Sequence, residues 1–250
     1  MGKYLVPLAL LASVGVATQV SAEEESDSMF ALGLGVSSEQ SIYTGVKNET
    51  NAMPFFMYEN GNFYVQGPEL GYNYFSNDQI TLGVAARYRM DGYAAGDSAH
   101  LAGMKDRDGT AEVGLTASYE TNAGEFSIEA FSDAGSKHKG YQVDFGWEKE
   151  IELSQNWSLT PEATIGYQSA KLNDYYYGVK ASEATANRAA YKAKGGTVYE
   201  VGVSANYMID ENQMLNMGVS YAGYGKAITD SSIVEDKSSV GAHLLYMYRF

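Results

Sequence analysis

The chain has 250 residues, a formal net charge of −14 and no cysteine. The lack of cysteine excludes disulfides, thiol catalysis and thiolate-bound metals, and the acidic balance argues against a nucleic-acid partner, which would need clustered Lys and Arg. The 27 glycines and 21 tyrosines suit a membrane β-barrel. An acidic soluble β-protein would have the same totals, so composition does not decide between membrane and solution.

The first 22 residues have the pattern of a secretory signal peptide. Lys3 lies in a short N-terminal region, an apolar run follows from about Leu5 to Val16, and Val20-Ser21-Ala22 is a small-residue cleavage site. A retained membrane anchor is the weaker alternative, because a helix needs roughly 18 apolar residues to span a bilayer. We therefore expect a signal peptide at 1–22, a short acidic segment at 23–27 and one barrel domain at 28–250.

Beyond residue 27, alternating apolar and polar side chains predict an all-β fold of about twelve antiparallel strands. Gly67-Pro68 leaves the third and fourth strands short, so ten strands remain an alternative. The predicted strands lie at about 28–37, 52–58, 63–66, 70–75, 80–89, 110–119, 125–132, 141–148, 159–167, 199–207, 215–221 and 240–250.

Short and long connections alternate between these strands. Asn60-Gly61 is a strong signal for a two-residue hairpin, and the turns at 76–79, 122–124 and 210–212 are also short. The long loops lie at 38–51, 90–109, 168–196 and 225–237. This alternation is typical of an up-and-down transmembrane barrel with short periplasmic turns and long extracellular loops, and an even strand number puts both chain ends in the periplasm.

The two faces of the predicted strands differ in polarity. No ionisable residue falls on the apolar face of the fifth to twelfth strands, as lipid would require, because a lipid-facing Lys or Arg costs about 2–4 kcal/mol at the bilayer midplane. A soluble sandwich or lipocalin, with its apolar face inward, is the alternative. The ionisable residues of the other face are expected to line the lumen: Arg87, Arg89, Glu112, Glu129, Asp144, Glu148, Glu162, Glu200, His243 and Arg249. They predict a solvated or paired interior network, or a selectivity ring for a cation-preferring pore.

The last strand, Val240 to Phe250, places Tyr246, Tyr248 and Phe250 on its apolar face and ends the chain on an aromatic residue. This pattern resembles the closing strand of bacterial outer-membrane barrels. We therefore expect these three residues to act as a C-terminal assembly signal, with the barrel-assembly machinery and outer-membrane lipid as partners.

The loops carry a family resemblance. Their segments are Tyr43-Thr44-Gly45, Leu101 to Asp108, Asp174-Tyr175-Tyr176-Tyr177-Gly178-Val179, Tyr191 to Gly196 and Asp230 to Val234, together with Pro54. In this order and spacing, over essentially the whole mature chain, they resemble the MipA/OmpV family of Gram-negative outer-membrane proteins. Ser232 stands where the family pattern has Pro, so that this loop lacks a rigid turn residue.

The resemblance implies a role but no catalytic residues. Some members scaffold a lytic murein transglycosylase and a bifunctional murein synthase at the outer membrane, and others are described as adhesins or surface antigens. Three hypotheses therefore stand: a peptidoglycan-enzyme scaffold, a small-solute channel, and an adhesin or receptor that uses its Tyr-rich loops.

The loop residues themselves predict a cap over the barrel mouth. Arg107 could pair with Asp174 or with Asp230 and so hold three loops together, with Met104, Tyr175, Tyr176 and Tyr177 supplying contact area. The same residues could instead form a partner surface. Asp97-Ser98-Ala99-His100 contains the residue types of a hydrolase, but four neighbours in a polar loop do not make an active site. No metal-ligand spacing, phosphate loop or nucleotide motif is present, so we expect no enzyme and no cofactor.

Overall fold

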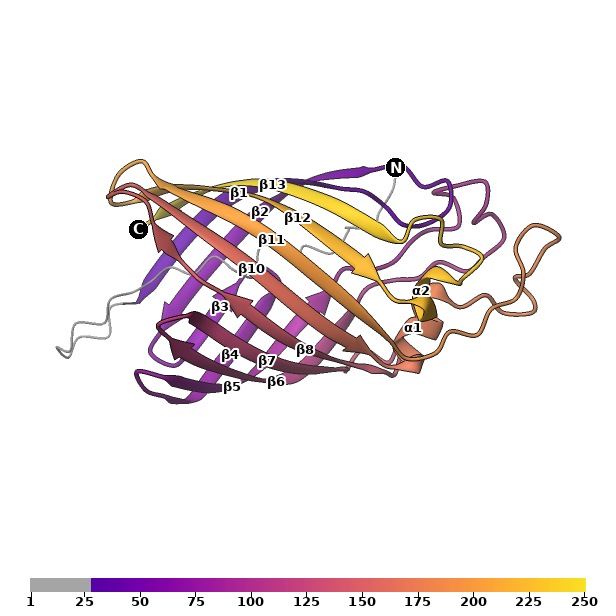
Figure 1. Ribbon diagram of the computed structural model, residues 1–250, viewed down its shortest axis with the longest axis horizontal. Helices are drawn as coiled ribbons and strands as arrows, with labels where there is room; N and C mark the ends of the chain where they lie inside the picture. The colour runs from indigo at the N-terminus through magenta and orange to yellow at the C-terminus, as the bar shows by residue number, and fades with distance from the viewer. Residues whose placement is uncertain (1–27) are drawn as a thin grey trace.

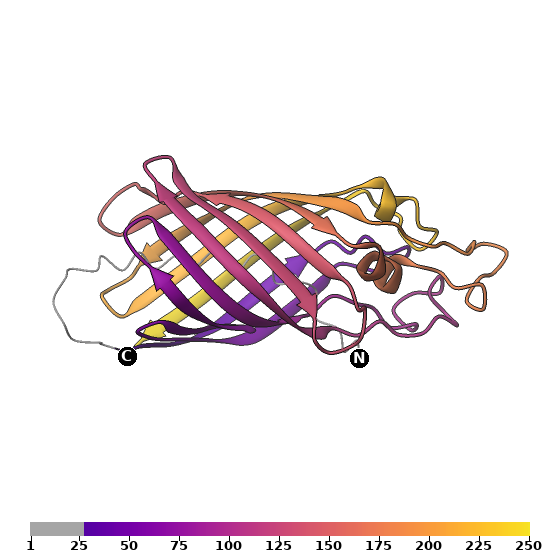
Figure 2. The ribbon, with the colours of Figure 1, turned by 90° about the horizontal axis from the view of Figure 1, so that it is seen from below.

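The computed structural model describes residues 28–250, which form a closed antiparallel β-barrel (Figures 1 and 2). The predicted signal peptide (1–22) and acidic segment (23–27) lie outside the described residues. Twelve strands close the wall in chain order, and β13 pairs with β1. They are β1 (Met29–Glu39), β2 (Glu49–Asn60), β3 (Phe63–Gln66), β4 (Glu69–Ser76), β5 (Ile80–Arg89), β6 (Thr110–Thr121), β7 (Gly124–Asp133), β8 (Tyr141–Glu148), β10 (Trp157–Gln168), β11 (Gly196–Met208), β12 (Gln213–Tyr224) and β13 (Ser238–Arg249).

The remaining elements are short. The two-residue strand β9 (Ile151–Glu152) pairs with the start of β10, and the helices are α1 (Ala170–Tyr177) and α2 (Lys226–Thr229). Within residues 28–250 neither helix has the length and hydropathy of a membrane span. The prediction of a twelve-strand antiparallel barrel is confirmed.

The two ends of the barrel differ in their connections. At the turn end, where β1 begins and β13 ends, segments 61–62, 77–79, 122–123, 149–156 and 209–212 join the strands. At the loop end, the connections are 40–48, 67–68, 90–109, 134–140, 169–195 and 225–237. The predicted alternation of short and long connections therefore has two exceptions, the Gly67-Pro68 turn at the loop end and the segment 149–156 at the turn end.

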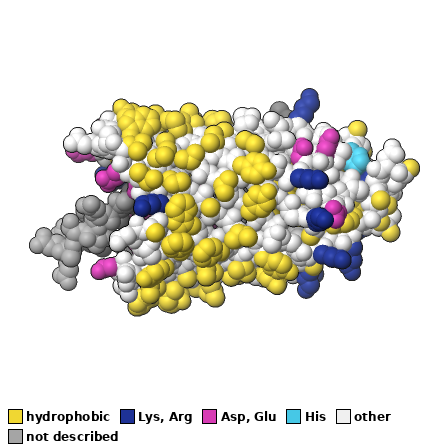
Figure 3. Space-filling model, in the orientation of Figure 1, with side chains coloured by type: hydrophobic (Ala, Val, Ile, Leu, Met, Phe, Trp, Pro, Cys, Tyr) yellow, Lys and Arg dark blue, Asp and Glu magenta, His cyan; other side chains and the backbone are white. Residues whose placement is uncertain are grey.

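The outer surface carries a band of apolar side chains. Leu34 is 60% exposed and Leu115 is 62% exposed, as expected for residues that lipid covers, and Figure 3 shows the hydrophobic side chains gathered over the strands. The ring pair Tyr199–Tyr221 lies toward the loop end and the pair Trp157–Tyr207 toward the turn end. The eight-residue step from Tyr199 to Tyr207 spans about 26 Å along the strand, or about 20 Å along the membrane normal at a tilt of about 40°. This separation fits aromatic girdles at the two membrane interfaces.

The first hairpin turn differs by one residue from the prediction. Asn60 pairs with Phe63, so the two central residues are Gly61 and Asn62, not Asn60 and Gly61. Gly61 has φ +56°, whereas Asn62 is not among the residues of positive φ. Glycine with positive φ at the first central position, followed by a residue of negative φ, is characteristic of a type II′ turn. The hairpin therefore forms where it was predicted, but its turn is centred one residue later than the predicted Asn60-Gly61.

The hairpin β3–β4 is much shorter than its neighbours. Its pairing with β2 covers Met57 to Asn60, and one further hydrogen bond runs from the Gly67 N–H to the Phe56 carbonyl. Residues 49–55 of β2 therefore pair with β1 alone. The barrel wall is lower at this place than on the opposite side.

Candidate functional site

The long loops fold over the loop end of the barrel as a cap with its own hydrophobic core. One cluster contains Ile42, Leu172, Tyr176, Tyr177 and Ile228, and a second contains Tyr93, Leu101, Met104, Val179 and Ile233. Isolated bridges Tyr43↔Val234, Tyr93↔Arg107 and Val179↔Tyr191 tie the segments together. We call these four segments (40–48, 90–109, 169–195 and 225–237) the loop cap.

Arg107 lies at the centre of the loop cap, but its ion-pair partner differs from the two expected. Its Nη2 pairs with Glu183 Oε2 at 3.0 Å, and both side chains are only 4% exposed. Its Nε donates to the Tyr175 carbonyl at 2.6 Å and its Nη1 to the Lys105 carbonyl at 2.7 Å. Arg107 therefore joins the 90–109 and 169–195 loops, which are two of the three loops that it was predicted to hold together, and it does so through a carboxylate that the sequence did not single out.

The two acidic residues expected beside Arg107 lie elsewhere. Asp174 is exposed, and its Oδ1 accepts a hydrogen bond from the Ala193 N–H at 3.0 Å. Asp230 is exposed at the end of α2. The structure therefore brings neither of them to the centre of the cap.

A second buried arginine, Arg188, was missed by sequence reasoning. It is 3% exposed, and its guanidinium donates to the carbonyls of Glu183, His100 and Ala102. No periodicity or motif marks this residue, which follows Thr185-Ala186-Asn187 in a polar loop. Only the folded loop puts three carbonyl groups within its reach.

The tyrosine triplet belongs mainly to the interior of the cap. Tyr176 is 1% and Tyr177 is 8% exposed, while the Tyr175 hydroxyl accepts a hydrogen bond from the Asp108 N–H at 3.0 Å. Met104 is 6% exposed, and its sulfur accepts from the Tyr93 hydroxyl at 3.7 Å. All seven predicted cap residues thus lie at the loop end, but Asp174 and Asp230 lie on its surface.

Burial and hydrogen bonding set the ionisation of the cap. Burial raises the pKa of Glu183, but hydrogen bonds from the N–H groups of Lys105 and Lys180 and from Arg107 outweigh this and leave the pKa below its ordinary value of 4.5. Burial raises the pKa of Tyr177 well above its ordinary value of 10. At neutral pH the cap therefore contains an ionised Glu183 and a neutral Tyr177.

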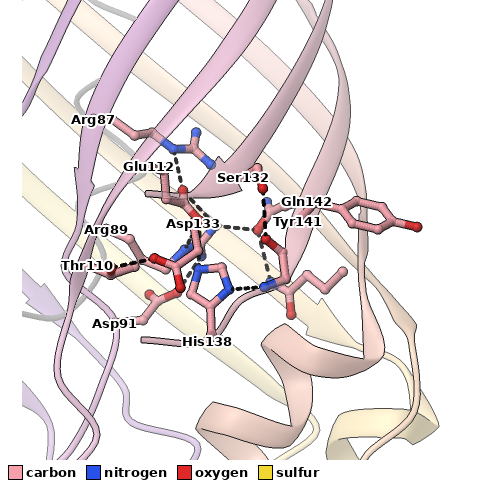
Figure 4. Close-up of polar contacts among 12 residues, drawn as sticks. Arg87, Arg89, Asp91, Thr110, Glu112, Ser132, Asp133, His138, Tyr141 and Gln142 are labelled. Atoms are coloured by element: carbon pink, nitrogen blue, oxygen red, sulfur yellow. Dashed lines mark hydrogen bonds and ion pairs between the residues drawn. The ribbon is translucent and has the colours of Figure 1, made fainter. Parts of the chain in front are cut away.

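Beneath the cap, the lumen carries a charged network centred on Glu112 (Figure 4). Glu112 is 0% exposed and accepts from Arg87 Nε and Arg89 Nε, each at 2.9 Å. His138 Nε2 lies 3.1 Å from the same carboxylate. Arg89 also pairs with Asp91 at 2.6 Å, and Arg87 with Glu129 at 3.5 Å. The basic side chains of this wall are therefore matched by carboxylates, which favours a structural network over free charge.

All ten residues expected in the lumen take the inward phase of their strands. Register shows how they meet: Arg87 stands opposite Glu112, Glu129 opposite Asp144, and Glu148 opposite Glu162. His243 Nε2 lies 2.6 Å from Asn216 Oδ1. Arg249 is the exception in exposure, because it lies at the rim of the turn end and donates to the Glu211 carbonyl.

The opposite wall of the lumen contains an apolar cluster toward the turn end, which the sequence did not predict. Ala31, Phe55, Met57, Leu245 and Met247 form a buried cluster at 0–4% exposure. These residues come from β13, β1 and β2, and the inward phase of β13 already contained two of them. The barrel interior therefore contains a packed apolar cluster as well as a charged network, which a simple alternation of apolar and polar faces does not predict.

The predicted assembly signal lies on the outer face. Tyr246, Tyr248 and Phe250 are 37%, 39% and 69% exposed, and the Phe250 ring centroid is 5.3 Å from that of Phe30. The aromatic end of the chain thus packs across the seam between β13 and β1. Its role in assembly stays a prediction. No group of three or more potential metal ligands occurs among residues 28–250.

The chain is similar to known outer-membrane proteins. The family described as "MltA-interacting protein MipA" matches residues 32–250. The outer membrane protein OmpV of Vibrio cholerae serotype O1 is 32% identical over 197 residues, covering 77% of this chain and 76% of OmpV. The MltA-interacting protein of Escherichia coli strain K12 is 26% identical over 235 residues, covering 92% and 94%. An outer membrane channel from Pseudomonas putida F1 has a TM-score of 0.48 at 14% identity, covering 92% of this chain and 97% of that one.

Proposed function

Because the chain belongs to the MipA/OmpV family of outer-membrane proteins, we propose that it is a non-catalytic scaffold which holds murein-remodelling enzymes at the outer membrane. The turn end faces the periplasm in this proposal, so that both chain ends lie there and the loop cap faces the outside. A lytic transglycosylase and a murein synthase are the partners that the family resemblance implies, and one relative carries the name MltA-interacting protein.

The loop cap is the observation that favours a scaffold over an open pore. Its two hydrophobic clusters and the buried Arg107–Glu183 pair join loops from separate parts of the chain over the mouth. A packed polar and apolar core of this kind resists the passage of solutes, because opening it would leave the buried Arg107 and Glu183 without partners. A barrel closed in this way acts as a rigid membrane anchor.

The turn end is where a periplasmic partner would bind. Its acidic side chains outnumber Lys149 and Arg249, and they are Glu59, Asp78, Glu120, Glu125, Glu150, Glu152, Asp210 and Glu211. The segment 149–156, the longest turn-end connection, offers the largest surface. A partner with a basic face would be steered to this end by charge complementarity.

Site-specific crosslinking in cells tests the scaffold. A photo-reactive residue at Gln155, exposed in the 149–156 segment, should give adducts that contain a murein transglycosylase or synthase. The same residue at Lys192, exposed in the loop cap, is the matched control and should give none. Normal barrel levels without any murein enzyme in the Gln155 adducts would contradict the proposal.

A cation-preferring channel is the second candidate, favoured by the excess of carboxyl groups over basic groups at the lumen-facing positions, which include Glu129, Asp144 and Glu200. Planar-bilayer recording of the refolded mature protein at two salt gradients separates the two functions. The scaffold predicts silence from a verified folded barrel, whereas reproducible cation-selective steps would favour the channel. The adhesin hypothesis has less support, because Tyr176 and Tyr177 pack inside the cap and offer little surface to a host ligand.

A further inference from the structure

Three exposed lysines meet at one part of the loop end, where the loops join the outer surface of the barrel. All lysines of residues 28–250 except Lys149 lie at this end, and Figure 3 shows Lys and Arg side chains along the loop-end edge of the hydrophobic band. The three that meet are Lys139, Lys171 and Lys194. We call them the lysine surface.

The start of α1 brings the first two of these lysines together. Gly140 lies so close to the helix that a Cβ there would be 2.6 Å from the Leu172 backbone nitrogen. Lys139 directly precedes Gly140, and Lys171 directly precedes Leu172. The β7–β8 connection and α1 therefore present the two lysines side by side.

Lys194 reaches the same place from the start of β11. Its carbonyl accepts a hydrogen bond from Asn173 Nδ2 at 2.9 Å, so it is tied to α1. The next residue, Gly195, packs against the ring of Tyr167, because a Cβ at Gly195 would collide with the Tyr167 hydroxyl. The lysine surface thus forms from three connections that converge above β8 and β10.

Two outward tyrosines lie directly below the lysine surface. Tyr141 begins β8 and Tyr167 is the last residue but one of β10. They are 50% and 45% exposed, and their ring centroids are 6.4 Å apart. Tyrosines at this position in a barrel mark the level at which lipid tails give way to head groups. The lysine surface therefore lies at the level of the lipid head groups.

The positive charge of the lysine surface is not neutralised by an ion pair. Within residues 28–250 the lysine that does form one is Lys137, which pairs with Asp108 at 2.6 Å. The carboxylates of the adjoining segments, Asp133 and Asp174, each accept a hydrogen bond from a backbone N–H group. The three ammonium groups are thus available to an external anion.

We propose that the lysine surface binds the phosphate groups of a phosphorylated glycolipid in the outer leaflet of the membrane. The ammonium groups donate to phosphate oxygens, and the acyl chains lie along the apolar outer face below, which includes Val143, Phe145 and Ile165. The inference rests on the orientation given under the proposed function, with the loop end outside. Phosphorylated glycolipid is the lipid of the outer leaflet, so the charges of lipid and protein are complementary there.

Lipid titration of the refolded full barrel in neutral detergent tests the site, with bisphosphorylated lipid A as the probe. We expect saturable binding, seen by native mass spectrometry as one lipid per barrel, which weakens as salt is added. Dephosphorylated lipid A should bind roughly a hundredfold more weakly, because each Lys at a charged membrane surface contributes about fivefold. Equal affinity for the two forms would overturn the proposal, and so would tighter binding of phosphatidylglycerol than of lipid A.

Variants locate the site. Changing all three residues of the lysine surface to Gln should weaken lipid A binding roughly a hundredfold, and Lys171→Gln alone should weaken it about fivefold. The matched control removes the same charge from exposed positions elsewhere in the loop cap, with Lys47→Gln, Lys105→Gln and Lys180→Gln, and should bind like wild type. An equal loss in both triple variants, or no loss in the first, would refute a defined site.

The orientation is tested separately, since the chain has no cysteine and an introduced one is unique. Lys192→Cys in the loop cap should react with a membrane-impermeant maleimide in intact cells, and Gln155→Cys at the turn end only after permeabilisation. The reverse pattern would overturn the proposal, because the lysine surface would then face the periplasmic leaflet. Neither the titration nor the labelling involves a murein enzyme, so failure of the scaffold alone would leave both results unchanged.

Discussion

Removal of Arg107 should open the loop cap while the barrel stays folded. In Arg107→Ala, the buried Glu183 loses its ion pair and the carbonyls of Tyr175 and Lys105 lose their donors. Loss of one partner of a buried pair costs about 3–5 kcal/mol. We expect the lower end, about 3 kcal/mol, because Glu183 keeps the N–H groups of Lys105 and Lys180 at 3.0 and 3.1 Å.

Proteinase K digestion of the folded protein measures this opening. When reclosing is fast, cleavage follows the population of the open state, and about 3 kcal/mol corresponds to roughly a hundredfold faster cleavage within the cap. Strand content and the mobility shift of the unheated barrel should not change. Faster cleavage within the cap, together with unchanged strand content and mobility, would show a local opening of the cap and not a general loss of stability.

The exposed pair Lys137–Asp108 provides the matched control. Its N–O distance is 2.6 Å, but the side chains are 43% and 45% exposed, and exposed pairs contribute little to stability. Lys137→Ala should therefore be cleaved within about twofold of the wild-type rate. If Arg107→Ala were also cleaved at the wild-type rate, the buried pair would not hold the cap and the reasoning would be wrong.

Two further predictions concern the cap and the lipid face. The pKa of Glu183 in the folded protein is lowered, so the stabilisation that ionised Glu183 gives the cap is fully present above the ordinary carboxyl pKa and is lost as the pH falls through the lower folded pKa. In wild type, protease cleavage of the cap should therefore accelerate below about pH 4. In Glu183→Gln this acceleration by acid should be absent. Leu115→Lys places a charge on an outward residue that is 62% exposed. It should lower the free energy of unfolding in lipid by about 2–4 kcal/mol, as measured by urea titration in vesicles. An unchanged free energy of unfolding would place Leu115 outside the membrane.

The sequence determines the wall of this barrel better than its interior. Period-2 alternation identified twelve strands and their outward faces, because lipid imposes one rule on every strand. The inward face obeys no single rule, since it can be hydrated, paired or packed. Leu245 and Met247 alternate with Leu244 and Tyr246 along β13, and nothing in that pattern distinguishes an apolar lumen from a wet one.

The cap shows the same difference between local pattern and long-range contact. Arg107 and the Tyr triplet could be recognised as cap residues from their segments, but the partner of Arg107 depends on how a 27-residue connection (169–195) folds back. Glu183 and Arg188 lie in a stretch with no hydrophobic periodicity. Their positions follow from tertiary packing, which no local spacing encodes.

The prolines of the barrel lie where strand pairing is interrupted, and this gives a further test. Pro68 forms the β3–β4 turn, and the Phe56–Gly67 bond means that even-numbered residues of β2 direct their amide groups toward β3. Pro54 therefore has its missing N–H on the side of β2 that has no strand partner. Pro161 likewise lies at a break in pairing, because residues 162–168 of β10 pair with β8 and residues 158–159 pair with β9. Its carbonyl accepts a hydrogen bond from the Lys149 N–H in the connection between these two strands.

Proline is tolerated in a sheet only where no ladder hydrogen bond is lost. Pro54→Ala should therefore fold and insert like wild type, since the restored N–H gains no partner in the wall. Val219→Pro is the matched opposite, because β12 is paired with β11 and β13 along its length. It should reduce the yield of heat-modifiable barrel strongly. Equal yields for Val219→Pro and Pro54→Ala would mean that interrupted pairing does not explain where the prolines lie.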